Sequence, residues 1–432
     1  MNEKIIKNVI ENKMVKNFLM IFSGEGIGSV FGFLATIFII NTVGSYNHGI
    51  LVGVQTYANL FYGLFSFKTF QSLIKYLARS EFENNVTASK LYIKWSLILD
   101  VICLMLTCFF GLVLKKYVIN LMGWDTNISK YCVIYLFIYL LNFQGTTIGV
   151  LRYFENFHYV VKANITCAFI RCLGFFISFL FKLDFISFFI FDCLGNIVKF
   201  LMMDYFTLIT LKDHNLLDFY KIKLEWCSEF LKFSFLCNLT STIDLPVNQI
   251  TTLIINKYLG FEATSVYNVF GSLGSAINKL GDPISQIIYP EMNQRISRKD
   301  IKGAKKLSSK VKKLMLILFI TSSLFVLVTG KFWLHLFISN PNNQLIPLIL
   351  YLGYICYCNA SMGTHNFFLA LGYVKYNIPI LIIVNIFYLC LLLFTVKRYA
   401  LVGVILTYAL QALMVVICKE FIMRVRNYVE IP

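Results

Sequence analysis

Charged and polar side chains lie inside apolar stretches of this 432-residue sequence, where a lipid bilayer would exclude them. A charge at the centre of a bilayer costs on the order of 3 kcal/mol, so such residues usually face a water-filled cavity or a partner. The clearest group recurs at steps of three or four residues, which places its members on one face of a helix: Cys237, Ser241, Asp244, Asn248, Thr251 and Thr252. This polar stripe predicts a cavity wall, with hydrogen bonding between helices as the alternative.

A proline interrupts the helix that carries this stripe. Pro246 removes a backbone N–H donor, and proline is a common cause of a sharp kink. We therefore expect a hinge at Pro246.

The first apolar stretch also carries an acid. Glu25 and Ser29 lie beside Gly24, Gly28 and Gly32, whose four-residue spacing permits close approach of another helix. Glu25 and Asp244 are the candidates for binding a proton or a sodium ion, unless Glu25 pairs with a buried base.

Three basic residues lie within apolar stretches, and they predict a place for an anion. Arg171 is the first candidate, and Lys279 and Lys199 follow. Local ion pairs are the alternative, because Asp282 lies one helical turn from Lys279 and because Asp192 and Asp204 lie near Lys199 in the sequence.

A later apolar stretch is polar enough to line a cavity. It contains Asn359, Ser361, Thr364, His365 and Asn366. His365 has the side chain that titrates near neutral pH, although a hydrogen-bonded structural role explains it equally well.

The composition of the chain indicates which structural elements carry these polar residues. The chain is 58% hydrophobic and 14% charged, more apolar than one soluble core can hide. It predicts an all-α polytopic membrane protein with about twelve spans of roughly 20 residues. Little chain is left for a soluble catalytic domain. The expected spans are 17–40, 48–67, 95–114, 131–150, 163–181, 185–209, 233–256, 263–288, 314–330, 344–370, 376–396 and 401–423.

The distribution of basic residues predicts the orientation. With both termini in the cytoplasm, about 28 of the 39 Lys and Arg residues lie in cytoplasmic segments, as the positive-inside bias requires. Two basic segments, 68–94 and 296–313, are expected to lie against anionic headgroups. Topology thus explains the net charge of +17, and we expect no nucleic-acid partner. The twelve cysteines show no paired metal spacing, so we expect no metal and no other cofactor.

A weak internal repeat divides the expected spans into two lobes of six helices, residues 1–212 and 213–432. An offset of about 218 residues aligns the spans and pairs Gly145 and Thr146 with Gly363 and Thr364. Parallel repeats of this kind are typical of transporters that bind their substrate in a central cavity.

The stretch from Ile243 to Pro290 resembles helices 7 and 8 of bacterial oligosaccharide-lipid flippases, the Wzx-type exporters of O-antigen and capsule repeat units. The shared features are an Asp in helix 7, a Leu-Gly turn, a Val-Tyr near the start of helix 8 and a Pro at its cytoplasmic end. The sequence ALGYVKYN near Ala370 and the segment that leads into the last span are also similar to this family. Gly24, Glu25 and Gly26 depart from it, because this region is commonly less acidic.

The resemblance implies the fold of the superfamily that also contains drug and cation antiporters and lipid II flippases. It implies movement of an undecaprenyl-diphosphate-linked oligosaccharide across the inner membrane by alternating access, without covalent chemistry. It also implies membrane lipids, a glycan polymerase and other assembly proteins as partners. A multidrug or cation antiporter is the first alternative. A membrane-embedded polysaccharide polymerase is the second, disfavoured because no long outside loop carries Arg or His.

Overall fold

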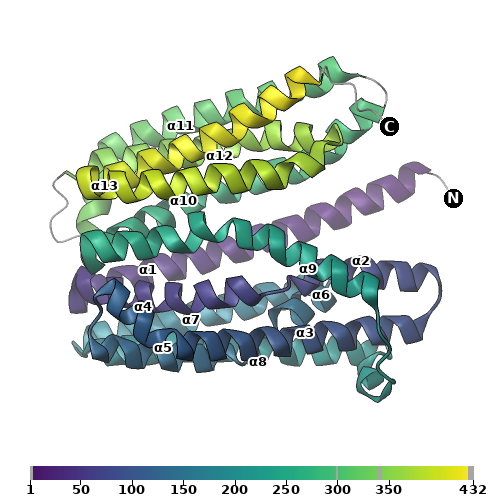
Figure 1. Ribbon diagram of the computed structural model, residues 1–432, viewed down its shortest axis with the longest axis horizontal. Helices are drawn as coiled ribbons and strands as arrows, with labels where there is room; N and C mark the ends of the chain where they lie inside the picture. The colour runs from purple at the N-terminus through teal and green to yellow at the C-terminus, as the bar shows by residue number, and fades with distance from the viewer. Residues whose placement is uncertain (1–2, 298–299, 338–342, 427–432) are drawn as a thin grey trace. The chain divides into compact units, whose positions relative to one another are not determined.

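The computed structural model describes residues 3–297, 300–337 and 343–426, without the side chains of residues 3–22, 240–241, 276, 280–291, 293–294, 297 and 374. In this part of the chain the structure contains helices and no strand, which confirms the predicted all-α class (Figure 1). The helices are α1 (Glu3–Phe65), α2 (Thr69–Phe82), α3 (Val86–Val113), α4 (Lys115–Met122), α5 (Thr126–Tyr139), α6 (Gln144–Tyr153), α7 (Phe157–Leu180), α8 (Phe185–Asp213), η1 (Leu217–Lys221), α9 (Ser228–Ile243), η2 (Pro246–Ile250), α10 (Thr251–Ser297), α11 (Ile301–Phe337), α12 (Leu345–Ala370), η3 (Tyr373–Tyr376) and α13 (Asn377–Val425).

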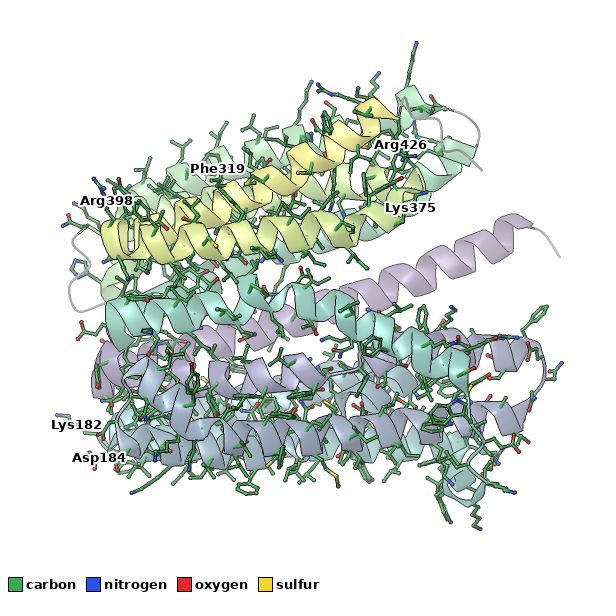
Figure 2. All side chains as sticks on the ribbon, in the orientation of Figure 1. Lys182, Asp184, Phe319, Lys375, Arg398 and Arg426 are labelled. Atoms are coloured by element: carbon green, nitrogen blue, oxygen red, sulfur yellow. The ribbon has the colours of Figure 1, made fainter. Side chains whose placement is uncertain are left out.

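Three of the helices each contain a break that divides them into two arms. The breaks are at Gly44 (φ 85°, ψ 166°), Gly260 (φ 86°, ψ 179°) and Ala400 (φ 48°, ψ −138°). Figure 2 shows the consequence in α13: Lys375 and Arg426, next to its two ends, lie together, whereas Arg398, beside the break, lies at the opposite end. The Arg426 guanidinium carbon lies 4.9 Å from the Tyr376 ring centre, so α13 is a hairpin of two antiparallel arms.

The described helices are long enough to cross a membrane many times. Seven of them, or eight when α5 and α6 are taken as one bent span, have the length and apolar character that a crossing requires. Because α1 and α13 each contribute two arms, and because α9 continues through η2 into α10, the described helices accommodate the twelve expected spans. The chain is a polytopic membrane protein.

The helices form two compact units. Unit 1 contains residues 1–43 and 53–245, and unit 2 contains residues 44–52 and 246–432. The division lies at Leu245 and Pro246, later than the expected boundary at 212 and 213. The reason is that α9, although it begins the second half of the sequence, packs on unit 1.

Helix α2 holds α9 by polar and aromatic contacts. Ser234 Oγ donates a 2.7 Å hydrogen bond to Ser72 Oγ, and both residues are buried. Arg79 Nη1 lies 3.0 Å from Glu229 Oε2, and Lys75 Nζ lies 4.0 Å from the ring centre of Phe233. The helix expected in segment 68–94 is therefore packed against other helices on one face in α2. Its buried face is covered by α3, α6 and α9.

The basic segment 296–313 is for the most part the beginning of a longer helix. From Ile301 onwards it forms the first turns of α11, continuous with the apolar part of that helix. Ala304, Ser308 and Val311 are buried, whereas Lys302, Lys305 and the other lysines of this stretch are exposed.

The start of the second arm of α1 packs in unit 2 against the start of the second arm of α10. His48 Nδ1 and Ser265 Oγ are 2.7 Å apart, and the Tyr46 and Phe261 rings are in edge contact. The two breaking glycines, Gly44 and Gly260, have nearly the same φ and ψ and lie 216 residues apart. This matched pair agrees with the predicted repeat of about 218 residues.

Glycine is required where these two arms touch. A Cβ on Gly49 would lie 1.9 Å from the carbonyl oxygen of Phe261, a backbone atom. In the first arm, Gly24 closely approaches Val161, but Gly28 and Gly32 have no atom within 4 Å of an added Cβ. The close helix approach predicted for all three glycines is therefore confirmed at Gly24 and wrong for Gly28 and Gly32.

We predict opposite effects for two glycine-to-alanine substitutions in α1. Gly49→Ala should lower the free energy of unfolding by roughly 1–3 kcal/mol, because the arms must separate to admit the methyl group. Gly28→Ala should leave it unchanged or raise it by up to about 1 kcal/mol, since alanine is the better helix former and space is open. Thermal unfolding of the two purified variants in detergent measures the difference, and equal melting temperatures would contradict the contact.

Candidate functional site

An ion pair between the adjacent helices α7 and α8 is the centre of the candidate site (Figure 1). Arg171 Nε lies 2.7 Å from Asp192 Oδ1. The Asp192 side chain has no exposed surface, whereas that of Arg171 is 33% exposed. A buried carboxylate without a partner would be strongly unfavourable, so Arg171 stabilises Asp192 in the interior of unit 1.

The second oxygen of Asp192 is held by three other side chains. Gln55 Nε2 donates to Oδ2 at 3.0 Å, Asn196 Nδ2 donates at 3.4 Å, and the Tyr135 hydroxyl makes a short hydrogen bond to the same atom. These donors come from the second arm of α1, from α8 and from α5. With α7 included, four helices therefore contact the two oxygens of Asp192.

The Arg171 guanidinium is held by one edge. Its Nε faces Asp192, and its terminal nitrogens form no hydrogen bond with any residue that the structure describes. The stem lies flat against α8 at Gly195, where an added Cβ would be 2.9 Å from Arg171 Cγ. The predicted cation is thus paired, yet it keeps donors that can bind a planar anion in a bidentate manner.

Lys199 adds a second positive charge beside this pair. It lies seven residues after Asp192 on the same face of α8, is half-buried, and its charge interacts with that of Arg171. The expected ion pairs with Asp192 and Asp204 are not formed: Asp192 is bound to Arg171, and among the described residues no carboxylate contacts the Lys199 amino group. Arg171, Lys199 and Asp192 together carry a net charge of +1.

A second buried carboxylate in unit 1 joins two helix starts. The span expected at 131–150 is broken between α5 and α6, which are inclined by 41°. Asp100 Oδ2 accepts a 2.7 Å hydrogen bond from the Thr146 backbone N–H in the first turn of α6. Its Oδ1 accepts a 3.0 Å bond from Thr69 Oγ1 at the start of α2. Both helix dipoles direct their positive ends at this carboxylate, a favourable arrangement that sequence spacing did not reveal.

The residues predicted to bind a proton or sodium lie apart from the Arg171 pair. Glu25 is exposed on α1, where its charge interacts with that of Arg152, and Ser29 donates to the Glu25 carbonyl at 2.9 Å. Asp244 is exposed where α9 ends.

The polar stripe around Pro246 divides into exposed and buried members. Pro246 begins a π-helical turn, Pro246–Ile250, next to the unit division, so the helix is broken where a hinge was predicted. Asn248 in this turn is exposed. Thr251 is buried and shares a 2.6 Å hydrogen bond with the Tyr388 hydroxyl, so for this member the packing alternative is right. The Ser241 side chain lies outside the described residues.

In unit 2, His365 has a basic neighbour, Lys419, which lies inside the span expected at 401–423. His365 Nδ1 is 2.7 Å from the amino group of Lys419, which is buried on the second arm of α13. Asn359 is also buried, and its Nδ2 donates to Asn278 Oδ1 at 2.9 Å. Lys279 is half-buried, while its expected partner Asp282 lies outside the described side chains.

Comparison with known proteins identifies the family. The model of the family described as "Polysaccharide biosynthesis protein" matches residues 14–295, well over half of the chain. The chain belongs to this family. One curated relative, "Inner membrane protein YghQ" of Escherichia coli (strain K12), is 22% identical over 264 residues, which cover 60% of this chain and 74% of that protein.

Solved structures show the fold of this polysaccharide biosynthesis family member. One is described as the inward-facing conformation of a multidrug resistance MATE family transporter of the MOP superfamily. It has a TM-score of 0.73 at 14% identity, covering 93% of this chain and 95% of that one. A MOP superfamily transporter from Pyrococcus furiosus Vc1 has a TM-score of 0.64 at 14% identity, with coverage of 97% and 96%. The predicted MATE-like fold is confirmed.

The described part of the chain offers little for metal or disulfide chemistry. Its cysteines are free thiols, and none of its His, Cys, Asp and Glu side chains gather in threes that could hold a metal ion.

We predict that Asp100 is needed for stability. Asp100→Ala should lower the free energy of unfolding by about 2–4 kcal/mol, because it leaves the Thr146 N–H and the Thr69 hydroxyl without their acceptor in a buried place. Asp213→Ala is the matched control, since Asp213 is exposed at the end of α8 and its loss should change stability by less than about 0.5 kcal/mol. Thermal unfolding of both variants provides the test, and a wild-type melting temperature for Asp100→Ala would refute this role.

Proposed function

We propose that this protein is a transporter that flips an undecaprenyl-diphosphate-linked oligosaccharide, such as an O-antigen or capsule repeat unit, from the cytoplasmic to the periplasmic face of the inner membrane. The observation that carries the proposal is the Arg171, Lys199 and Asp192 cluster with its net positive charge. A diphosphate brings strong negative charge into the hydrocarbon, and it needs fixed cations there. Membership in the polysaccharide biosynthesis family supports a glycan-linked substrate.

In this proposal the residues of unit 1 bind the diphosphate without covalent chemistry. The terminal nitrogens of Arg171 form the planar fork that matches phosphate oxygens, and the Lys199 ammonium acts as a point charge beside it. The sugars are proposed to contact the polar residues that the sequence predicts to line a cavity, with Lys279 as a further cation: Ser29, Ser241, Asn248, Asn359 and His365. The polyprenyl tail stays in the lipid, and the hinge at Pro246 allows the lobes to alternate.

The remaining assignments follow from the sequence. Both termini are proposed to be cytoplasmic, and a glycan polymerase and other assembly proteins receive the product. A proton or sodium gradient acting through Glu25 or Asp244 is proposed to drive the cycle. Unchanged export after Glu25→Gln and Asp244→Asn are combined would exclude both carboxylates from that role.

A multidrug or cation antiporter is the second candidate, favoured by the resemblance to solved multidrug transporters. A carrier of organic cations needs an acid whose charge is not already compensated. In unit 1 the opposite holds at the ion pair, because Asp192 is compensated by Arg171 and Lys199 adds a positive charge. Efflux of cationic dyes without glycan export would favour the antiporter.

We predict that export depends on both cations of the cluster. In a flippase-deleted strain, Arg171→Ala and Lys199→Ala should each reduce surface glycan by about tenfold or more, because each removes a charge that receives the diphosphate. Lys116→Ala is the control, because Lys116 is exposed on α4 and should support wild-type export. Surface glycan is scored at equal protein abundance, and normal glycan from both cluster variants would exclude the proposed binding place.

A further inference from the structure

The Asp192 carboxylate does more in this cluster than reduce its net charge. We infer that Asp192 is a positioning residue that both orients Arg171 for a diphosphate and weakens the binding enough for release. This inference rests on the proposed function and names the residue that controls its binding place.

The orienting task follows from which atoms are paired. Asp192 Oδ1 lies 2.7 Å from Arg171 Nε, so the carboxylate contacts the guanidinium at Nε, and the terminal nitrogens form no hydrogen bond with the described residues. Asp192 itself cannot follow a moving guanidinium, because Gln55, Tyr135 and Asn196 hold its other oxygen. The Arg171 stem is confined as well, since it lies against Gly195 of α8. The guanidinium is therefore confined before an anion binds, which reduces the entropy lost on binding.

The weakening task follows from charge. Without Asp192 the cluster would carry +2 on Arg171 and Lys199, and a dianionic diphosphate in a low-dielectric interior would be held very tightly. A carrier gains nothing from such affinity, because it must release its substrate on the other side. The fixed negative charge of Asp192, 2.7 Å from the Arg171 Nε, repels the same phosphate that the terminal nitrogens attract. A net charge of +1 on the cluster therefore permits both binding and release of the diphosphate.

The experiment measures affinity and transport separately in the full-length protein. Asp192→Asn is nearly isosteric and keeps an oxygen that can face Arg171. We expect it to bind geranyl diphosphate, used as the probe in detergent, roughly ten- to a hundredfold more tightly than the wild type does. Surface glycan export should fall in the same variant, because release becomes slow. A residue needed only for packing would not tighten binding while it lowers export.

Two further variants distinguish an effect of charge on the affinity for geranyl diphosphate from an effect of local structural damage. Asp204→Asn removes a half-buried carboxylate from the same helix away from Arg171, and it should leave the affinity for geranyl diphosphate unchanged. Asp192→Asn combined with Lys199→Met restores the net charge to +1 and should bring the affinity back toward the wild-type value.

The orienting task has its own test, which leaves Asp192 in place. Arg171→Lys keeps the positive charge but has no fork, so its single ammonium is taken by Asp192, and binding should weaken by about tenfold or more. This variant also serves if Asp192→Asn does not fold. Wild-type affinity in Arg171→Lys would overturn the orienting task, and unchanged or weaker binding in a folded Asp192→Asn would overturn the weakening task.

The controls also distinguish this inference from the proposed function. If the wild-type protein does not bind geranyl diphosphate, the proposed function fails. If the wild type binds it and Asp192→Asn behaves as the wild type does, only the role of Asp192 fails.

Discussion

Hydrocarbon offers no hydrogen-bonding partner, so every polar group that this chain places inside its helices must be satisfied by the protein itself. Unit 1 meets this constraint around two carboxylates. Asp192 gathers one cation and three neutral donors, and Asp100 gathers a backbone N–H and a hydroxyl. Because their partners come from several helices, each acid fixes the relative positions of the helices that surround it.

The two carboxylates serve different ends. Asp100 lies at the starts of α2 and α6, where their helix dipoles are favourable for an anion, and its partners use both of its oxygens. This arrangement stabilises two breaks in otherwise long helices. Asp192 instead faces a guanidinium that is still one third exposed, so part of its partner's binding capacity is kept for something else. One acid therefore supports the architecture, and the other supports the candidate site.

The contacts also show how the repeated halves share their elements. Gly44 and Gly260 adopt nearly the same backbone conformation, and the arms that follow them meet at His48 and Ser265. The start of the second arm of α1, residues 44–52, thus belongs to unit 2, while α9 packs with α2 of unit 1. Each unit contains a short piece of the other half of the sequence. The chain passes between the units at three places: at Gly44 and at Gly53 within α1, and at Pro246, between α9 and η2.

The sequence by itself determined the all-α membrane class, the number of spans, the repeat and the identity of Arg171 as a buried cation. These follow from hydropathy and from the cost of a charge in lipid, which act on each segment separately. Only the tertiary structure decided which groups meet. Gln55, Tyr135 and Asp192 lie in three separate spans, and no spacing rule joins them. The breaks near Thr69 and Gln144 likewise depend on Asp100 from another helix. Pairing of this kind is a property of packed helices, because a partner brought from a distant span leaves no periodic signal in the segment that receives it.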